Sequence, residues 1–362
     1  MEMEYTYSIS GSDTNVVDDN QGQGLELNTT YYYKVYRIDS LNVQQDSSNT
    51  VNATTFGATS QNYSWESIDI GESLSSLSDV WGTDENNVYA VGSVNIDGEY
   101  YGILKWDGDT WRPELEIGGK LKIVGFSKED IWVAGGSVYH YNGIKWDRID
   151  GYSSNNQDFP LDQALFDNVP YRAIWGTNSE DLYFAGREGK IVHWNGSEGT
   201  MMETPTTELF IYDLEGLSNN YIIGVGYPLQ LPSSSMIYNG EKWMFYDKVD
   251  INEALLTLCI INPIESFFGG SGIFRLYEDD WSKVADFGYI VYSMYRDKNT
   301  GEILAAGAVD GVMMNNGLEW KDFTGLASND HTLYTGTYLV NGNAFCVGTN
   351  GTTAKIATGR RN

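Results

Sequence analysis

Residues 78–92 read SDVWGTDENNVYAVG, which is two short apolar runs joined by a polar turn. A near copy, RAIWGTNSEDLYFAG, occupies residues 172–186, and a looser copy, IVGFSKEDIWVAG, occupies residues 123–135. Short apolar runs bounded by turn residues are typical of β-strands. The stretch therefore predicts an antiparallel strand pair that recurs along the chain.

The second run of each copy ends in glycine, and this glycine recurs at Gly92, Gly135, Gly186, Gly226, Gly269, Gly307 and Gly348. A third run follows each glycine and usually ends at Asn-Gly or Asp-Gly, which favour the positive φ angles of a type I′ turn. A fourth run opens with an aromatic residue in most units, as at Trp111 and Trp320. Four antiparallel strands per unit predict a seven-bladed β-propeller, an all-β fold of four-stranded blades.

The last unit lacks a fourth run, whereas an unassigned run at residues 63–68 precedes the first unit. Its Trp65 takes the place that Trp111 and Trp320 hold in their own units. We therefore expect this N-terminal strand to complete the last blade, which would close the ring and remove free sheet edges.

This repeat resembles bacterial propeller repeats written as Trp-Gly-Thr, a short polar stretch, and Val-Tyr/Trp-Ala-Val-Gly. Such repeats occur in secreted and cell-surface proteins, often beside fibronectin type III-like domains. The resemblance covers residues 63–357. It implies the architecture and an extracellular or cell-surface location, but no particular chemistry.

Residues 24–35, GLELNTTYYYKV, resemble the fibronectin type III signature of a leucine and a turn followed by Thr-x-Tyr-x-x-x-Val. In that family the tyrosine at the position of Tyr31 forms a tyrosine corner, its hydroxyl hydrogen-bonded back to the turn. We expect a partial fibronectin type III-like β-sandwich at 1–56, a linker at 57–62 and the propeller at 63–362. The first strands of such a sandwich are missing before Met1, so we expect the natural protein to continue N-terminally. The alternative is a complete segment that packs on the next domain.

Acidic residues number 50 and basic residues 22, which gives a formal net charge of −28. An anionic surface repels phosphate, so nucleic acid and anionic membranes are poor partners. No run of apolar residues is long enough for membrane insertion, and no signal peptide is recognisable. Cys259 and Cys346 both lie in apolar runs and are expected to be buried thiols.

Catalytic and metal-binding motifs are weak. No nucleophile elbow, metalloprotease or phosphate-loop motif is present. His140 and His193 lie in third strands of adjacent units, but strand alternation does not require them to face one metal. Residues 297–302, DKNTGE, space oxygens like the beginning of a calcium loop but lack the distal acid. A plain turn is therefore favoured, with Ca²⁺ the only cofactor left open. No catalytic residue is predicted, and enzymatic activity is left undecided with its absence favoured.

Long insertions lie at residues 93–100, 147–170 and 227–235, and blade geometry places all three on one face of the disc. The predicted binding residues on this long-loop face are Tyr100, Tyr101, Tyr152, Phe159, Phe166 and Tyr227. Aromatic side chains on loops over a rigid scaffold suit stacking on a sugar ring or docking of a protein. The alternative is that these rings cap their own loops against the disc.

The leading hypothesis is a non-catalytic extracellular recognition or adhesion module that binds a glycan or a protein through this face. One alternative is a propeller glycoside hydrolase or lyase, whose carboxylates would converge at the mouth of the central channel. Another is a structural subunit of a surface layer or filament, which would accept a neighbour's strand at a free sheet edge.

Overall fold

The computed structural model describes residues 25–39, 43–117, 119, 122–151, 161–162, 171–228, 235–248, 254–286, 288–326 and 329–362. The chain divides into two compact units, Met1–Thr59 and Ser60–Asn362. Within these described ranges, no helix is long and apolar enough to span a membrane.

The second unit is a β-propeller of seven four-stranded antiparallel sheets, as the repeat predicts. Blade 1 consists of β6 (Ser76–Asp84), β7 (Asn87–Ile96), β8 (Glu99–Trp106) and β9 (Trp111–Leu115). Blade 2 consists of β10 (Lys122–Ser127), β11 (Asp130–Ala134), β12 (Val138–Tyr141) and β13 (Trp146–Arg148). Blade 3 consists of β16 (Ala173–Asn178), β17 (Asp181–Ala185), β18 (Ile191–Trp194) and β19 (Gly199–Met201). A short parallel pair, β14 (Asp150–Gly151) and β15 (Leu161–Asp162), follows blade 2, and the 3₁₀ turn η2 (Arg187–Gly189) lies within blade 3.

Blades 4 to 7 consist of β20 (Leu209–Ser218), β21 (Tyr221–Pro228), β22 (Ser235–Tyr238) and β23 (Trp243–Phe245); β24 (Thr257–Asn262), β25 (Glu265–Gly269), β26 (Ile273–Tyr277) and β27 (Asp280–Ala285); β28 (Val291–Arg296), β29 (Ile303–Gly307), β30 (Val312–Asn315) and β31 (Trp320–Asp322); β32 (Leu333–Val340), β33 (Asn343–Thr349), β34 (Ala354–Arg361) and β5 (Tyr63–Ile70). The fifth blade, where the repeat is weakest in sequence, is a complete four-stranded sheet.

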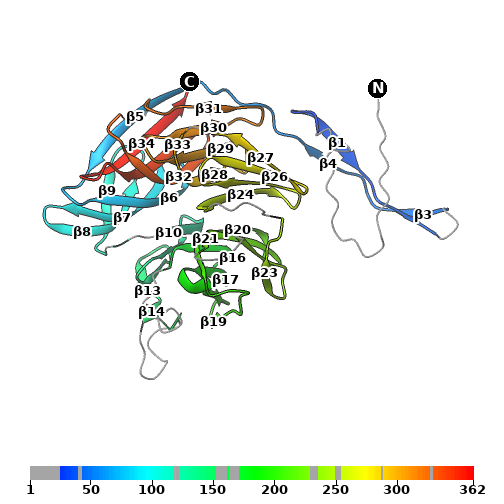
Figure 1. The fold of residues 1–362 in the computed structure, drawn as a ribbon, viewed down its shortest axis with the longest axis horizontal. Helices are drawn as coiled ribbons and strands as arrows, with labels where there is room; N and C mark the ends of the chain where they lie inside the picture. Colours follow the sequence, from blue (N-terminus) through cyan, green and yellow to red (C-terminus); the bar gives the residue numbers. More distant parts are fainter. Residues whose placement is uncertain are drawn as a thin grey trace. The chain divides into compact units, whose positions relative to one another are not determined.

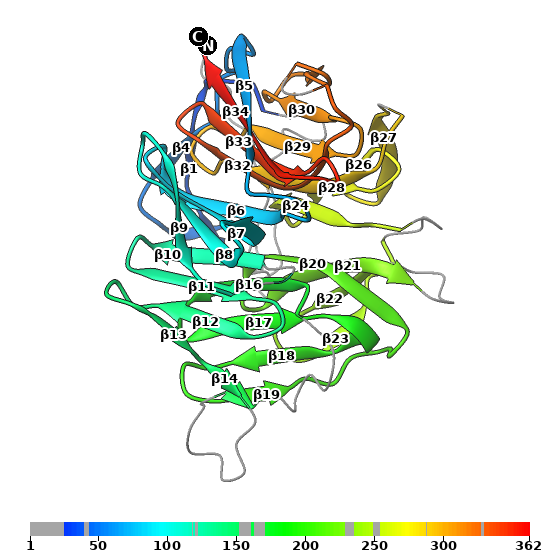
Figure 2. The ribbon, with the colours of Figure 1, turned by 90° about the vertical axis from the view of Figure 1, so that its left-hand side faces the viewer.

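The first strands of the seven blades form an inner ring. Each of them contacts the first strand of the next blade, in the order β6, β10, β16, β20, β24, β28, β32 and back to β6. Figure 2 shows the blades following one another from cyan through green to orange and red. Connections between strands 2 and 3, and between strand 4 and the next blade, lie at one end of these strands. We call this end the loop face and the opposite end the turn face.

The N-terminal strand closes the ring as predicted. β5 pairs antiparallel with β34, from Ile70 opposite Ala354 to Tyr63 opposite Arg361, and the two strands lie side by side in Figure 1. Trp65 lies opposite Gly359, and a Cβ added at Gly359 would come within 2.8 Å of the indole. This glycine therefore makes room for the ring of Trp65.

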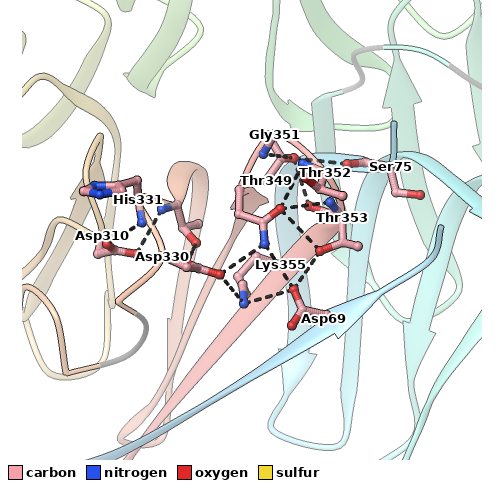
Figure 3. Close-up of polar contacts among 12 residues, drawn as sticks. Asp69, Ser75, Asp310, Asp330, His331, Thr349, Gly351, Thr352, Thr353 and Lys355 are labelled. Carbon is pink, nitrogen blue, oxygen red and sulfur yellow. Dashed lines mark hydrogen bonds and ion pairs between the residues drawn. The ribbon is translucent and has the colours of Figure 1, made fainter. Parts of the chain in front are cut away.

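A network of charges and hydroxyls holds this closure on the loop face (Figure 3). The Lys355 ammonium lies 3.0 Å from the Asp69 carboxylate and 2.7 Å from that of Asp330. Thr353 donates a 2.7 Å hydrogen bond to Asp69, and Thr332 donates one of 2.6 Å to Asp330. These residues come from β34, β5 and the segment that enters β32, so we call them the closure network.

The recurring glycine at the end of the second strand has a structural cause. In four blades it faces a bulge near the start of the first strand. A Cβ at Gly92 would lie 2.3 Å from the Ser76 carbonyl oxygen, and one at Gly348 would lie 1.9 Å from that of Leu333. Such distances are far below van der Waals contact, so a side chain there would push the first strand out of the inner ring.

The turns between third and fourth strands differ from the predicted type I′ geometry. Gly143 has a φ of +86°, but Asn142 is not among the residues with positive φ. Instead, the Asn142 side-chain oxygen accepts hydrogen bonds of 3.1 Å from the backbone N–H groups of both Ile144 and Lys145. The same pattern recurs at Asp107, Asn195, Asn239 and Asn316. The Asx residue thus acts through its side-chain acceptor, and only the glycine requires the left-handed region.

The apolar core lies between successive blades. Trp132 and Ala134 of blade 2 pack with Leu182, Phe184 and Val192 of blade 3, and the same arrangement continues around the ring. A fully buried large apolar side chain contributes about 1.5–3 kcal/mol. Because each blade depends on its neighbours for burial, the ring is a single cooperative unit. Both cysteines are buried free thiols, as expected.

The first unit contains two strand pairs among its described residues. β1 (Thr30–Tyr33) pairs with β4 (Val51–Thr54), and β2 (Tyr36–Ile38) pairs with β3 (Gln44–Ser47). The Tyr31 hydroxyl accepts a 2.8 Å hydrogen bond from the Glu26 backbone N–H. This contact is the one that the tyrosine-corner resemblance implies, but two strand pairs do not define a fibronectin type III-like domain.

Candidate functional site

Three carboxylates on first strands of the inner ring contact the first strand of a neighbouring blade. Asp79 follows a bulge in β6, and Asp213 follows a bulge in β20, where Glu215 lies two residues further along. Strand alternation places Asp213 and Glu215 on the same side of β20. The inner ring therefore carries an acidic group on blade 1 and a pair of acidic groups on blade 4.

These carboxylates hold adjacent blades together. Asp79 accepts a 3.2 Å hydrogen bond from the Ile123 N–H of blade 2. Asp213 accepts one of 2.9 Å from the Thr257 hydroxyl of blade 5, and Glu215 accepts one of 2.9 Å from the Ile260 N–H. Each carboxylate thus satisfies a donor on the neighbouring first strand, which is a structural use of its oxygens.

Burial also shifts the protonation of these groups. It raises the pKa of Asp79 and of Asp213, with Lys122 acting in the opposite direction on both. Burial raises the pKa of Glu215 to about 8, while the hydrogen bond from Ile260 opposes this shift. A carboxyl with such a pKa is largely protonated at neutral pH and can donate a proton as well as accept one.

A second group of residues lies on the loop-face side of blades 3 and 4. The guanidinium carbons of Arg172 and Arg187 lie 5.5 and 5.2 Å from the ring centre of Phe210. The ring of Tyr212 lies 4.6 Å from that of Phe210. We call these four residues the arginine–aromatic cluster. Cation–π contacts of this kind orient the guanidinium groups over the aromatic face.

The positions of these residues follow from the local fold. Arg172 directly precedes β16, and its backbone N–H bonds to the Ala185 carbonyl at 2.7 Å. Arg187 begins the turn η2, which connects the second and third strands of the same blade. Phe210 and Tyr212 lie on β20, the first strand of the next blade. The cluster is therefore assembled across the junction between two blades.

The structure places the predicted aromatic residues in different environments. Tyr100 is 45% exposed and Tyr227 is 50% exposed. Tyr101 instead packs against the core between blades 7 and 1. Tyr100 belongs to blade 1 and Tyr227 to blade 4, so the structure does not place them in one site. Tyr152, Phe159 and Phe166 lie outside the described residues.

The predicted long loop at 93–100 is a strand extension instead, whereas residues 229–234 of the one at 227–235 lie outside the described residues. β7 and β8 continue to Ile96 and Glu99, and a two-residue turn with positive φ at Asp97 and Gly98 joins them. β21 likewise continues through Tyr227, which pairs with Phe210. Because directly opposite residues project to the same side of a sheet, Tyr227 lies beside the arginine–aromatic cluster. Apolar and aromatic residues continue beyond the repeat boundary, as at Val94 and Tyr101. This continuation was the sequence signal for the longer strands.

Sequence reasoning missed all four residues of the arginine–aromatic cluster. Arg172 begins one copy of the repeat and Arg187 follows its terminal Gly186, in a chain that is otherwise strongly acidic. Two arginines at opposite ends of one repeat were the available signal, because an antiparallel strand pair brings its two ends together.

The other candidate metal residues have protein partners, and for Glu302 this partner lies on the next blade. His140 Nε2 lies 2.9 Å from Asp130, and His193 Nε2 lies 2.8 Å from Asp181. Asp297 accepts a 2.8 Å hydrogen bond from the Asn299 N–H, and Glu302 pairs with Arg361. Within the described ranges, no group of three or more acidic, histidine or cysteine side chains is arranged to hold a metal ion.

Comparisons with known proteins agree on the fold alone. No protein-family model matches the chain, and no curated protein is similar to it. Among solved structures it is similar to YCF48 bound to D1 peptide, with a TM-score of 0.59 and 13% identity over 85% of this chain and 100% of that one. The WD40 β-propeller domain of Doa1 gives a TM-score of 0.60 and 11% identity over 83% of this chain and 97% of that one.

A catalytically inactive virginiamycin B lyase from Staphylococcus aureus with quinupristin gives a TM-score of 0.63 and 10% identity, covering 83% of this chain and 100% of that one. These similarities include a peptide-bound protein and an enzyme. They define the class of protein, a seven-bladed β-propeller, and leave its activity to be argued from its own residues.

Proposed function

We propose that the propeller is a non-catalytic binding module that recognises a protein ligand through the loop face. The observation that carries the proposal is the exposure of Tyr227, which is 50% exposed at the end of a strand whose preceding residues 222–226 are buried. A rigid strand that ends in an exposed aromatic side chain gives binding energy with little loss of conformational entropy.

Two further features support this reading. Tyr227 adjoins the arginine–aromatic cluster, and tyrosine, phenylalanine and arginine are the residue types enriched in protein interfaces. The inner-ring carboxylates, by contrast, already accept hydrogen bonds from neighbouring blades. A peptide-bound propeller among the similar structures is consistent with a protein ligand. A glycan ligand remains the other class proposed for the same face, because aromatic side chains also stack on sugars.

The test is selection of ligands with the full-length chain, using a displayed random-peptide library and a glycan array in parallel. Ligands of the loop face should bind Tyr227→Ser at least about tenfold more weakly, the loss of one central aromatic contact. Ile144→Ser is the matched control, because Ile144 is 88% exposed on a turn-face hairpin. If both variants weaken ligand binding equally, or if neither variant weakens it, the proposal that the ligand binds on the loop face is wrong.

A propeller glycoside hydrolase or lyase is the second candidate, and one observation favours it. Asp213 and Glu215 project from the same side of β20, and burial raises the pKa of both. Carboxyl groups with raised pKa values serve as general acids in glycosidases. Release of reducing sugar that Glu215→Gln abolishes, with melting unchanged, would favour the enzyme over the binding module.

We also propose that residues 1–56 are a partial fibronectin type III-like domain and that the protein acts outside the cell or at its surface. The Tyr31 hydrogen bond supports the first statement, and the repeat resemblance supports the second. A structural role in a surface layer or filament would use the free edges of the β1–β4 pair. Strictly monomeric behaviour at high concentration, measured by sedimentation, would count against that role.

A further inference from the structure

The arginine–aromatic cluster is unusual because no carboxylate among the described residues forms an ion pair with it. The chain has nine arginines, and six of them form an ion pair with a carboxylate among the described residues: Arg37, Arg112, Arg148, Arg275, Arg360 and Arg361. Arg172 and Arg187 have no ion pair with any carboxylate in the part of the chain that the structure describes. In a protein of net charge −28, two adjacent arginines without a carboxylate partner among the described residues require an explanation.

The acidic residues that follow Arg187 and Tyr212 in sequence have other partners. Glu188 follows Arg187 directly, but its carboxylate lies 3.2 Å from the Lys190 ammonium. Asp213 follows Tyr212, but it accepts its hydrogen bonds from Thr257 and Leu258 of blade 5. The fold therefore brings two guanidinium groups to one phenylalanine ring, while the carboxylates of Glu188 and Asp213 are bonded to other residues.

Arg172 is also partly withdrawn from water. Its Nε is buried without a hydrogen-bond partner among the described residues. Burial lowers the pKa of Arg172, and the nearby charge of Arg187 acts in the same direction while Tyr212 opposes it. A partly buried guanidinium without a partner is unfavourable by itself and is stabilised when an anion binds.

We propose that the arginine–aromatic cluster is the receptor for a carboxylate group of a bound peptide, either an acidic side chain or the terminal carboxylate. This inference rests on the proposed function and names the chemistry that its ligand must present. Guanidinium groups bind carboxylates through paired N–H donors. Phe210, Tyr212 and Tyr227 supply apolar surface beside the charge, and the acidic protein disfavours more highly charged anions such as phosphate.

The first test needs no knowledge of the natural partner. Protein labelled with ¹⁵N-arginine is titrated with sodium N-acetylphenylalaninate, with the uncharged N-acetylphenylalaninamide, and with sodium chloride. The Nε–Hε signals of Arg172 and Arg187, assigned with R172Q and R187Q, should shift saturably with the carboxylate only. The signal of Arg112, which already pairs with Asp107 at 2.9 Å, should not shift. Equal shifts with the amide, or none with the carboxylate, would overturn the inference.

The second test separates the two sources of the carboxylate. Peptides selected on the full-length chain are compared as free acids, as C-terminal amides and with acidic side chains changed to amides. Removal of the recognised carboxylate should weaken binding by about ten- to a hundredfold, as for a charge-assisted hydrogen bond. The same change should have no effect on the R172Q/R187Q variant.

The outcomes distinguish this inference from the function on which it rests. In one case, the selected peptides bind wild type and R172Q/R187Q equally but do not bind Tyr227→Ser. That result would overturn the inference of a carboxylate receptor and retain the proposed binding face. In the opposite case, the carboxylate shifts the arginine signals but the peptides bind wild type and Tyr227→Ser equally. That result would retain the anion site and overturn the proposed protein-binding face.

Discussion

Two groups of charged residues lie on the loop face, one where β5 completes blade 7 and one at the junction of blades 3 and 4, and they are organised in opposite ways. In the closure network, Lys355 is 6% exposed and lies between two carboxylates, each of which also accepts hydrogen bonds from threonine hydroxyls. In the arginine–aromatic cluster, two cations share one aromatic ring without a carboxylate among the described residues. The comparison shows that this fold can pair its charges where they close the ring, and it motivates the proposal that a ligand supplies the carboxylate at the junction of blades 3 and 4.

The largest expected effect is on the closure network. Lys355→Ala would leave Asp69 and Asp330 facing each other without their shared cation, and it should lower the free energy of unfolding by about 2 kcal/mol. Chemical denaturation of the full-length chain measures this change. Lys145→Ala is the control, because Lys145 pairs with Asp147 on the surface and should change stability by less than about 0.5 kcal/mol. Equal effects would mean that the closure network contributes no more than a surface pair.

An intermediate effect is expected from the buried acid of the inner ring. The pKa of Glu215 is about 8 in the folded state, whereas the ordinary value is 4.5. A raised carboxyl pKa destabilises the folded state at pH above 8, and this cost is relieved as pH falls from 8 towards 4.5. Glu215→Gln should therefore be more stable than wild type at pH 9, by on the order of 1 kcal/mol, and should lose this advantage by pH 5.

The closure network titrates in the opposite sense. Hydrogen bonds from Thr353 and Lys355 lower the pKa of Asp69, and those from Lys355, Thr332 and Asn350 lower the pKa of Asp330 against the effect of burial. Their contribution to stability is complete above the ordinary value of 3.8 and is lost as pH falls below it. The difference in stability between wild type and Lys355→Ala should therefore shrink in acid, in denaturation curves recorded from pH 6 to pH 3.

The smallest expected effect on stability comes from the arginine–aromatic cluster. R172Q/R187Q removes two like charges that have no ion pair with a carboxylate among the described residues, so the free energy of unfolding should change by less than about 0.5 kcal/mol, in either direction. Thermal and denaturant unfolding beside Lys355→Ala would show the contrast. A loss as large as that of Lys355→Ala would show that the arginines hold the blades together, and the comparison would fail.

The repeat was sufficient to predict the blades, because its glycine and turn residues are required by the local backbone geometry. Gly92 makes room for a carbonyl of its own strand pair, and Trp65 takes the place of other fourth-strand tryptophans. The candidate site could not be predicted in the same way. Arg172, Arg187 and Phe210 belong to different segments that meet only across a blade junction, and each is ordinary in its own segment. Tyr227 was predicted as part of a long insertion at 227–235, whereas the structure has it within β21, and its neighbours were not predicted.

The central claim is that the protein binds its ligand on the loop face at the junction of blades 3 and 4. Hydrogen–deuterium exchange of the full-length chain, with and without a peptide selected for binding, tests this claim most directly. Peptide binding should slow exchange in β20, β21 and η2 and leave the turn-face hairpins at residues 141–146 and 315–320 unchanged. Protection confined to those hairpins, or to the first unit, would contradict it.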